Sequence, residues 1–84
     1  GWNNVTGQAG IYVVTSADTV LSGNVCSEGG LSANQDYGID IGANCDYSTL
    51  VGNGVRNNDV AGIRISGTGN ANVRAQGNPG FADQ

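Results

Sequence analysis

Two short markers recur in the same order three times along the sequence. The first, Gly-Ile-x-(Val/Ile), occurs at residues 10–13, 38–41 and 62–65. The second, Gly-Asn, occurs at residues 23–24, 52–53 and 77–78. Successive copies lie 24 to 29 residues apart, and the two markers keep the same phase. Because an internal period of this size is the signature of repeat architectures, the chain is restricted to folds in which equivalent segments stack.

Each repeat is predicted to consist of short strands joined by tight corners. In Gly-Ile-x-(Val/Ile) the two apolar residues are two positions apart, so they face the same side of a strand. A second period-two segment, such as residues 19–21, precedes each Gly-Asn, and a third short strand is expected at Val25-Cys26 and at Gly54-Val55. Gly and Asn tolerate the left-handed torsions of corners. We therefore expect about three short strands in each repeat.

Composition excludes several other classes of protein. The 84 residues include 15 Gly, and each Gly in a helix interior costs about 1 kcal/mol relative to Ala, which excludes an all-helical fold. The net charge of −4, with no Lys, excludes phosphate-driven binding of nucleic acid. We expect no membrane insertion, because no run of about 18 apolar residues is present. We also expect no metal site and no cofactor, since His is absent and no phosphate-loop motif is complete.

A single repeat cannot bury its own apolar face, so equivalent residues are expected to stack in a parallel ladder. The predicted core columns are Ile11, Ile39 and Ile63; Val13, Ile41 and Ile65; and Leu21, Leu50 and Ala75. The predicted corner ladder of amide side chains consists of Asn24, Asn53 and Asn78. The predicted fold is an all-β parallel β-helix of about three coils.

The pattern from about Gly10 to Phe81 resembles the repeats of right-handed parallel β-helix proteins of the pectate-lyase-like family. It is most similar to the β-helical parts of bacteriophage tailspike, spike and fibre proteins. The resemblance implies a right-handed solenoid. It does not select one activity, because polysaccharide lyases, hydrolases, C5-epimerases, adhesins and phage spikes share this fold.

We expect residues 1–84 to form a single β-helical segment. Its repeats span about 1–22, 23–51 and 52–76, with a C-terminal end at 77–84. Pro79 lacks an N–H group and is expected to mark the end of the ladder, with Phe81 folded over the last coil. A stack of three coils exposes strand edges at its ends. We therefore expect a fragment or processed product of a longer β-helix, completed laterally as a homotrimer.

The outward residues of the first marker are Tyr12, Asp40 and Arg64, one in each repeat. One interpretation is a carbohydrate-binding strip, in which the Tyr ring packs on a sugar and the charged groups bind hydroxyls. The other, which we favour, is a solvated face with an Asp40–Arg64 ion pair worth at most about 1 kcal/mol. Tyr37 and Tyr47, expected at corners or loops, would extend such a strip or form trimer contacts.

Two pairs of carboxylates have similar phase in the repeats, Asp36 with Asp59 and Asp18 with Asp46. Glycoside hydrolysis uses two carboxylates about 5 to 9.5 Å apart, and Ca²⁺ also binds clustered carboxylates. A third interpretation, which we favour, is that these side chains satisfy the backbone of corners. We assign no catalytic residue and no metal ligand, and we expect that this segment is not an enzyme.

Cys26 and Cys45 are 19 residues apart, which does not match one repeat. Stacking alone therefore does not predict a disulfide, and we expect buried, free cysteines that act as small apolar residues. Their redox state stays open.

We expect a structural segment that binds glycan or receptor in the spike or fibre of a phage or phage-like particle. Its expected partners are two further copies of the chain, a cell-surface polysaccharide and other virion proteins, in the virion or outside the cell. The alternative is the C-terminal coils of a secreted polysaccharide lyase, hydrolase or C5-epimerase whose active site lies upstream. The glycan and the host stay open.

Overall fold

The computed structural model describes residues 8–26, 35–58 and 60–80, and all the regular elements in these ranges are strands. The strands are β1 (Gln8–Val13), β2 (Val20–Ser22), β3 (Gln35–Ile41), β4 (Thr49–Val51), β5 (Ala61–Ile65) and β6 (Arg74–Gln76). The all-β prediction is therefore confirmed for the described part of the chain.

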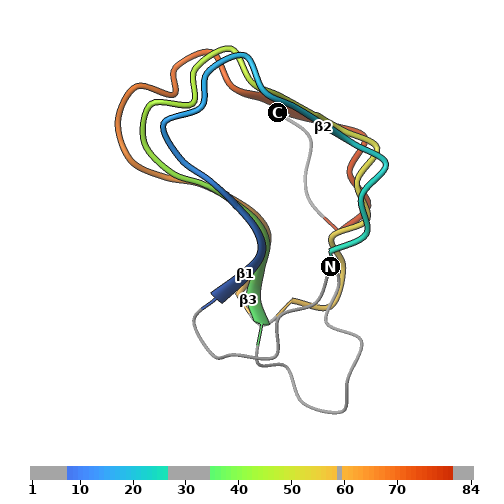
Figure 1. The fold of residues 1–84 in the computed structure, drawn as a ribbon. Helices are drawn as coiled ribbons and strands as arrows, with labels where there is room; N and C mark the ends of the chain where they lie inside the picture. Colours follow the sequence, from blue (N-terminus) through green and yellow to red (C-terminus); the bar gives the residue numbers. More distant parts are fainter. Residues whose placement is uncertain (1–7, 27–34, 59, 81–84) are drawn as a thin grey trace.

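Successive strands alternate between two sheets. β1, β3 and β5 form one three-stranded sheet, and β2, β4 and β6 form the other, with every pair parallel. We call residues 8–26, 35–58 and 60–80 the first, second and third coil, because each range contributes one strand to each sheet. The three coils overlay one another in Figure 1. The chain thus forms two small parallel sheets from equivalent strands of its repeats.

The register of both sheets places equivalent residues of the three coils opposite one another. The paired triplets are Ile11–Ile39–Ile63, Val13–Ile41–Ile65 and Leu21–Leu50–Ala75. These are the neighbours that the phase of the two sequence markers assigns. The repeats differ in length, and the additional residues therefore lie outside these paired positions.

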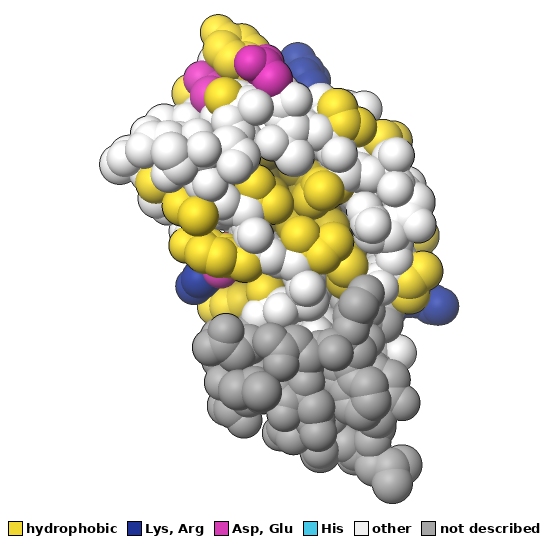
Figure 2. Space-filling view, in the orientation of Figure 1, with side chains coloured by type: hydrophobic (Ala, Val, Ile, Leu, Met, Phe, Trp, Pro, Cys, Tyr) yellow, Lys and Arg dark blue, Asp and Glu magenta, His cyan; other side chains and the backbone are white. Residues whose placement is uncertain are grey.

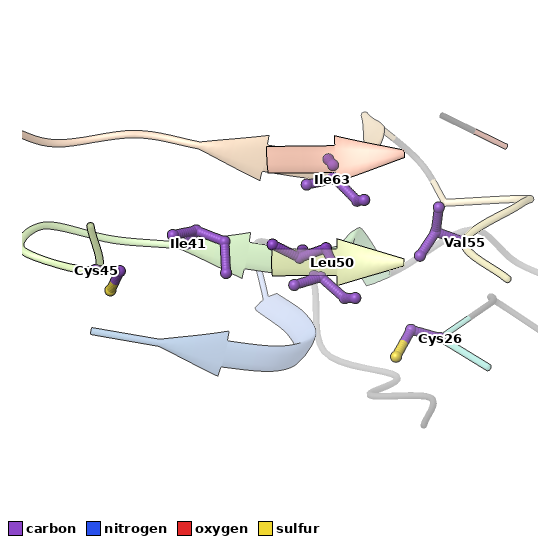
Figure 3. Packing of buried hydrophobic residues seen from close by; sticks show 8 residues of the cluster. Cys26, Ile41, Cys45, Leu50, Val55 and Ile63 are labelled. Atoms are coloured by element: carbon purple, nitrogen blue, oxygen red, sulfur yellow. The ribbon is translucent and has the colours of Figure 1, made fainter. Parts of the chain in front are cut away.

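The apolar core lies between the two sheets. Figure 3 shows Ile41 and Ile63 of one sheet and Leu50 of the other within the same cluster. The buried members of this cluster are Cys26, Ile39, Ile41, Cys45, Leu50, Val55, Ile63 and Ala75. Fully burying a Leu or Ile side chain stabilises a protein by roughly 1.5–3 kcal/mol, so this cluster is the main apolar contribution to the fold.

The two cysteines are fully buried and are not joined by a disulfide, as predicted. Figure 3 shows them at opposite sides of the core, with Cys45 next to Ile41 and Cys26 near Val55. The Sγ atom of Cys45 donates a weak hydrogen bond to the carbonyl oxygen of Val13 at 3.5 Å. Both side chains thus fill space in the core as small apolar residues.

No regular strand occupies the expected third position in the described part of the repeats. Val25 and Gly54 form an isolated parallel bridge, so within the described residues the predicted third segment pairs in parallel but does not form a regular strand. Pro79 belongs to this ladder because its carbonyl accepts a hydrogen bond from the Val55 N–H at 2.8 Å. Phe81 lies outside the described residues.

The Gly of the first marker is required by close packing between backbones. A Cβ atom on Gly38 would lie 2.6 Å from the carbonyl oxygen of Cys26, and one on Gly62 would lie 2.7 Å from that of Val55. Neither glycine has a positive φ. The bridge segment of one coil therefore crosses directly over the strand that begins the next coil, and only Gly leaves room for it.

The corner Asn residues form a continuous ladder of hydrogen bonds. The Oδ1 atom of Asn53 accepts bonds from the backbone N–H and the Nδ2 of Asn24, both at 3.0 Å. The Oδ1 of Asn78 accepts the same two bonds from Asn53, both at 2.9 Å. In turn, Nδ2 of Asn53 and Nδ2 of Asn78 each donate to the carbonyl of the Leu in the preceding coil.

Each Asn of the ladder follows a glycine in the left-handed region. The φ angles of Gly23, Gly52 and Gly77 are 69°, 66° and 63°. An added Cβ would contact nothing within 4 Å at any of these positions, so torsion alone selects Gly here. The same left-handed corner in every coil directs the following Asn inward.

Substituting G38A should destabilise the chain strongly, whereas G54A should not. A methyl group added at Gly38 would overlap backbone on both sides, and overpacking of this kind typically costs about 1–3 kcal/mol. At Gly54, which has no positive φ, the nearest atom to an added Cβ is 4.0 Å away. Urea unfolding of the two variants measures the difference, and equal free energies of unfolding would contradict the packing explanation.

Asn53→Ala should cost more stability than Asn24→Ala. The first substitution leaves buried ladder partners without bonds, and each such group costs roughly 1–3 kcal/mol. Asn24 is half-buried and stands at one end of the ladder, so its removal should cost less. The comparison is made by thermal and urea unfolding. A larger loss for Asn24→Ala would show that the ladder does not stabilise the stack.

Candidate functional site

Tyr12, Asp40 and Arg64 form a row across the outer face of the β1–β3–β5 sheet. The register pairs Tyr12 with Asp40 and Asp40 with Arg64. Each residue follows an inward-facing Ile in its strand, so its side chain points away from the core. The structure therefore brings together the three residues that the sequence proposed as a strip.

Asp40 and Arg64 form a bidentate ion pair. Nε of Arg64 lies 3.0 Å from Oδ1 of Asp40, and Nη2 lies 2.6 Å from Oδ2. Hydrogen bonding to Asp40 raises the pKa of Arg64 above its ordinary value. The expected ion pair is confirmed, but Asp40 is only 5 % exposed, so the face is not solvated at this residue. Because both carboxylate oxygens are occupied, Asp40 holds the guanidinium in place.

Tyr37 supports the other side of Arg64. We expected Tyr37 at a corner or loop, and this was wrong, because it lies within β3. The guanidinium carbon of Arg64 is 4.2 Å from the centroid of the Tyr37 ring, and Nη1 donates to Tyr37 Oη at 3.0 Å. Tyr37 pairs in register with Ala9 and Ala61, whose small side chains leave room beside the ring. Arg64 is thus fixed by a carboxylate and by an aromatic ring.

Tyr12 is the exposed aromatic residue of the row, with 62 % of its surface accessible. A Cβ atom built on Gly42 would lie 3.0 Å from Tyr12 Oη and 3.3 Å from Cε1. The edge of the ring therefore rests on the backbone of the second coil. Tyr12 and the fixed donors of Arg64 lie on strands either side of Asp40, so the row carries an aromatic face and hydrogen-bond donors two strands apart.

A hollow of about 340 Å³ lies at the corner between the two sheets, away from the strip. It is lined by Tyr47, Ala71, Asn72, Val73 and Arg74. Tyr47 lies in a turn, as expected, and is 64 % exposed with a left-handed φ of 59°. Sequence reasoning did not find this hollow, because residue types at its lining positions differ between the repeats; Arg74, for example, is in register with Thr49 and Val20.

The carboxylate of Asp46 satisfies the backbone of this corner. It accepts bonds from the N–H of Asn72 at 2.6 Å and from Nδ2 of Asn72 at 3.1 Å. The backbone bond from Asn72 is the main cause that lowers the pKa of Asp46 below its ordinary value. Asp18 is adjacent through its backbone, since its N–H donates to the Asp46 carbonyl at 3.0 Å. This geometry agrees with the corner interpretation for Asp46.

The second pair of carboxylates cannot be assembled from the described residues. Asp36 lies in β3, and its carbonyl accepts a bond from the Val60 N–H at 2.9 Å. Asp59 lies outside the described residues. Within the described ranges no group of three or more His, Cys, Asp or Glu side chains is placed to hold a metal ion.

Three buried or half-buried amide residues with structural roles were missed. Gln35 donates from Nε2 to Oδ1 of Asn58 at 2.7 Å, and Nδ2 of Asn58 donates to the Cys26 carbonyl at 3.0 Å. Oδ1 of Asn70 accepts the Cys45 N–H at 2.8 Å. Asn58 and Asn70 each link one coil to another, and Gln35 supports Asn58 within the second coil. The abundance of Asn was visible in the sequence, but Asn58 and Asn70 lie outside both repeated markers, as does Gln35, whose register partner is Gln8.

No protein-family model, curated protein or solved structure matches this chain. Among the residues that the structure describes there is also no helix with the length and apolarity needed to cross a membrane.

Replacing the Asn72 side chain should raise the pKa of Asp46 only part of the way to its ordinary value of 3.8. Asn72→Ala removes the Nδ2 bond but keeps the backbone N–H bond, which is the larger cause. Because the pKa of Asp46 is lowered in the folded state, its contribution to stability is present above the ordinary value and is lost as pH falls through the lowered one. NMR titration of the carboxyl carbon measures the pKa. Thr68→Ala, on the exposed part of the same corner, is the control and should leave it unchanged.

Proposed function

We propose that this chain is a segment of a right-handed parallel β-helix that serves as a structural and glycan-binding part of a phage or phage-like spike or fibre. The alternation of strands between two parallel sheets supports the helical part of the proposal. β1 and β3 are parallel neighbours connected through β2 of the other sheet. Crossovers between parallel strands of one sheet are right-handed in about 98 % of cases, which favours the right-handed form.

The single observation that supports glycan binding is the exposed ring of Tyr12 in the same row as a rigidly held guanidinium. Arg64 keeps 45 % of its side-chain surface accessible although Asp40 and Tyr37 fix its position. A preorganised donor loses less conformational entropy on binding than a free surface Arg. The row crosses three strands spaced by about 4.8 Å, so it presents an extended surface suited to a chain of sugars.

Tyr12→Ala should weaken binding to a cell-surface polysaccharide about tenfold, which corresponds to about 1.4 kcal/mol. The substitution removes the exposed ring and leaves the Asp40–Arg64 pair intact. The matched control is Val20→Ala, because Val20 is 67 % exposed on β2 in the other sheet. Binding is measured by glycan array and then by calorimetry with the best oligosaccharide.

Equal affinity of the Tyr12 and Val20 variants would contradict the assignment of the binding face. Release of reducing ends from the polysaccharide by the chain alone would favour the alternative, an enzyme. Light scattering on the same samples gives the number of chains per particle. A mass of three chains is expected of a spike segment, and a stable monomer would contradict a trimer.

A further inference from the structure

The two ends of the stack differ in how well their core residues are covered. In the third coil, Ala75 is fully buried and Asn78 is 2 % exposed, although no described strand stacks beyond them. Their counterparts in the first coil, Leu21 and Asn24, are only half-buried. Figure 2 has the same orientation as Figure 1, in which β1 lies at the front. It shows apolar side chains exposed between the two sheets at this end of the stack. We call the first-coil end, formed by β1, β2 and Asn24, the open end.

Backbone groups at the open end point away from the stack. In the second coil the N–H of Thr49 donates back to the Thr19 carbonyl, and in the third the N–H of Arg74 donates back to the Ser48 carbonyl. Val20 is the register partner of Thr49. By the alternation of a parallel ladder, the N–H and C=O of Val20 point out of the first coil on its uncovered side. The outer edge of β2 therefore presents N–H and C=O groups to which a further parallel strand can bond.

The Asn ladder is incomplete at the same end. Oδ1 of Asn53 accepts two bonds from Asn24, but Oδ1 of Asn24 accepts none from any described residue. Nδ2 of Asn53 donates to the Leu21 carbonyl at 3.0 Å, whereas Nδ2 of Asn24 reaches only the nearby Ser22 carbonyl at 3.4 Å. Within the described ranges, Asn24 thus lacks the amide donors of another Asn and the carbonyl that precedes a Gly-Asn corner.

We propose that the open end binds a further parallel coil of the same repeat type. Its strands pair with β1 and β2, and its apolar column covers Ile11 and Leu21. The Asn of its Gly-Asn corner donates its N–H and Nδ2 to Oδ1 of Asn24, and its Leu-position carbonyl accepts Nδ2 of Asn24. This inference rests on the β-helical part of the proposed function and does not depend on glycan binding.

A second copy of this chain fits the open end less well. Two open ends related by a two-fold axis would pair β2 with an antiparallel β2, and each Asn24 would face another end-of-ladder amide. At the opposite end of a second copy Ala75 and Asn78 are buried, although Ile65 is half-buried, so the Leu-position column and the Asn ladder are already covered there. A coil that continues the repeat supplies the missing donors and acceptor without rearrangement.

Adding one coil ahead of Ala9 tests the proposal. A copy of residues 37–60 is inserted there, because Tyr37 is the register partner of both Ala9 and Ala61. Hydrogen exchange of the Val20 amide is measured by NMR in the parent and in the extended chain. We expect exchange at Val20 to slow at least tenfold on extension, approaching the rate at Thr49, because its N–H gains a partner.

A control chain carries the same insertion with L50D in the inserted copy, so that the added coil cannot bury its apolar column. Here Val20 should exchange as fast as in the parent. Equal Val20 rates in all three chains, or loss of the parent's dispersed NMR spectrum in the extended chain alone, would overturn the proposal. Slow Val20 exchange in the parent together with a mass of two chains would overturn it in favour of a second copy. Glycan binding through Tyr12 is measured in a separate experiment, and the outcome of the coil-extension test does not change it.

Discussion

Parallel pairing of equivalent residues is the interaction on which the rest of the structure depends. It places Ile39 between Ile11 and Ile63 and Leu50 between Leu21 and Ala75, so each inward column is continuous. Because side chains alternate across a strand, a slip of one residue would turn every inward side chain outward. The small core between two three-stranded sheets therefore exists only in this register.

Amide side chains make the same register possible at the corners. A corner buries backbone groups that a strand would pair, and an unpaired buried polar group destabilises a protein by roughly 1–3 kcal/mol. Asn53 and Asn78 bond both along the ladder and to the preceding coil, while Asn58 and Asn70 connect other corners. Among the described residues, no buried side-chain nitrogen or oxygen lacks a partner. The high Asn content is thus a structural requirement of stacked corners.

The register of the core also determines which side chains lie side by side on the outer face of the sheet. Since the Ile columns fix the register, the residues between them also align, which brings Asp40 within bonding distance of Arg64. The resulting row combines a rigid guanidinium with the exposed ring of Tyr12. The open end has the same cause, because the register also aligns the strand edges and the Asn side chains. In the first coil these groups face outward on one side, whereas in the other coils they bond to a neighbouring coil.

The sequence by itself determined the parallel all-β arrangement, the three inward columns and the Asn ladder, because equivalent residues recur in phase and must meet when repeats stack. Only the tertiary structure decided contacts between positions that are not equivalent. These include Tyr37 beside Arg64, Gly38 beneath the Cys26 carbonyl, and the bonds of Asn58 and Asn70. The different coverage of the two ends also required coordinates. A repeat pattern specifies what lies above and below a residue, but not which corner or bridge crosses beside it.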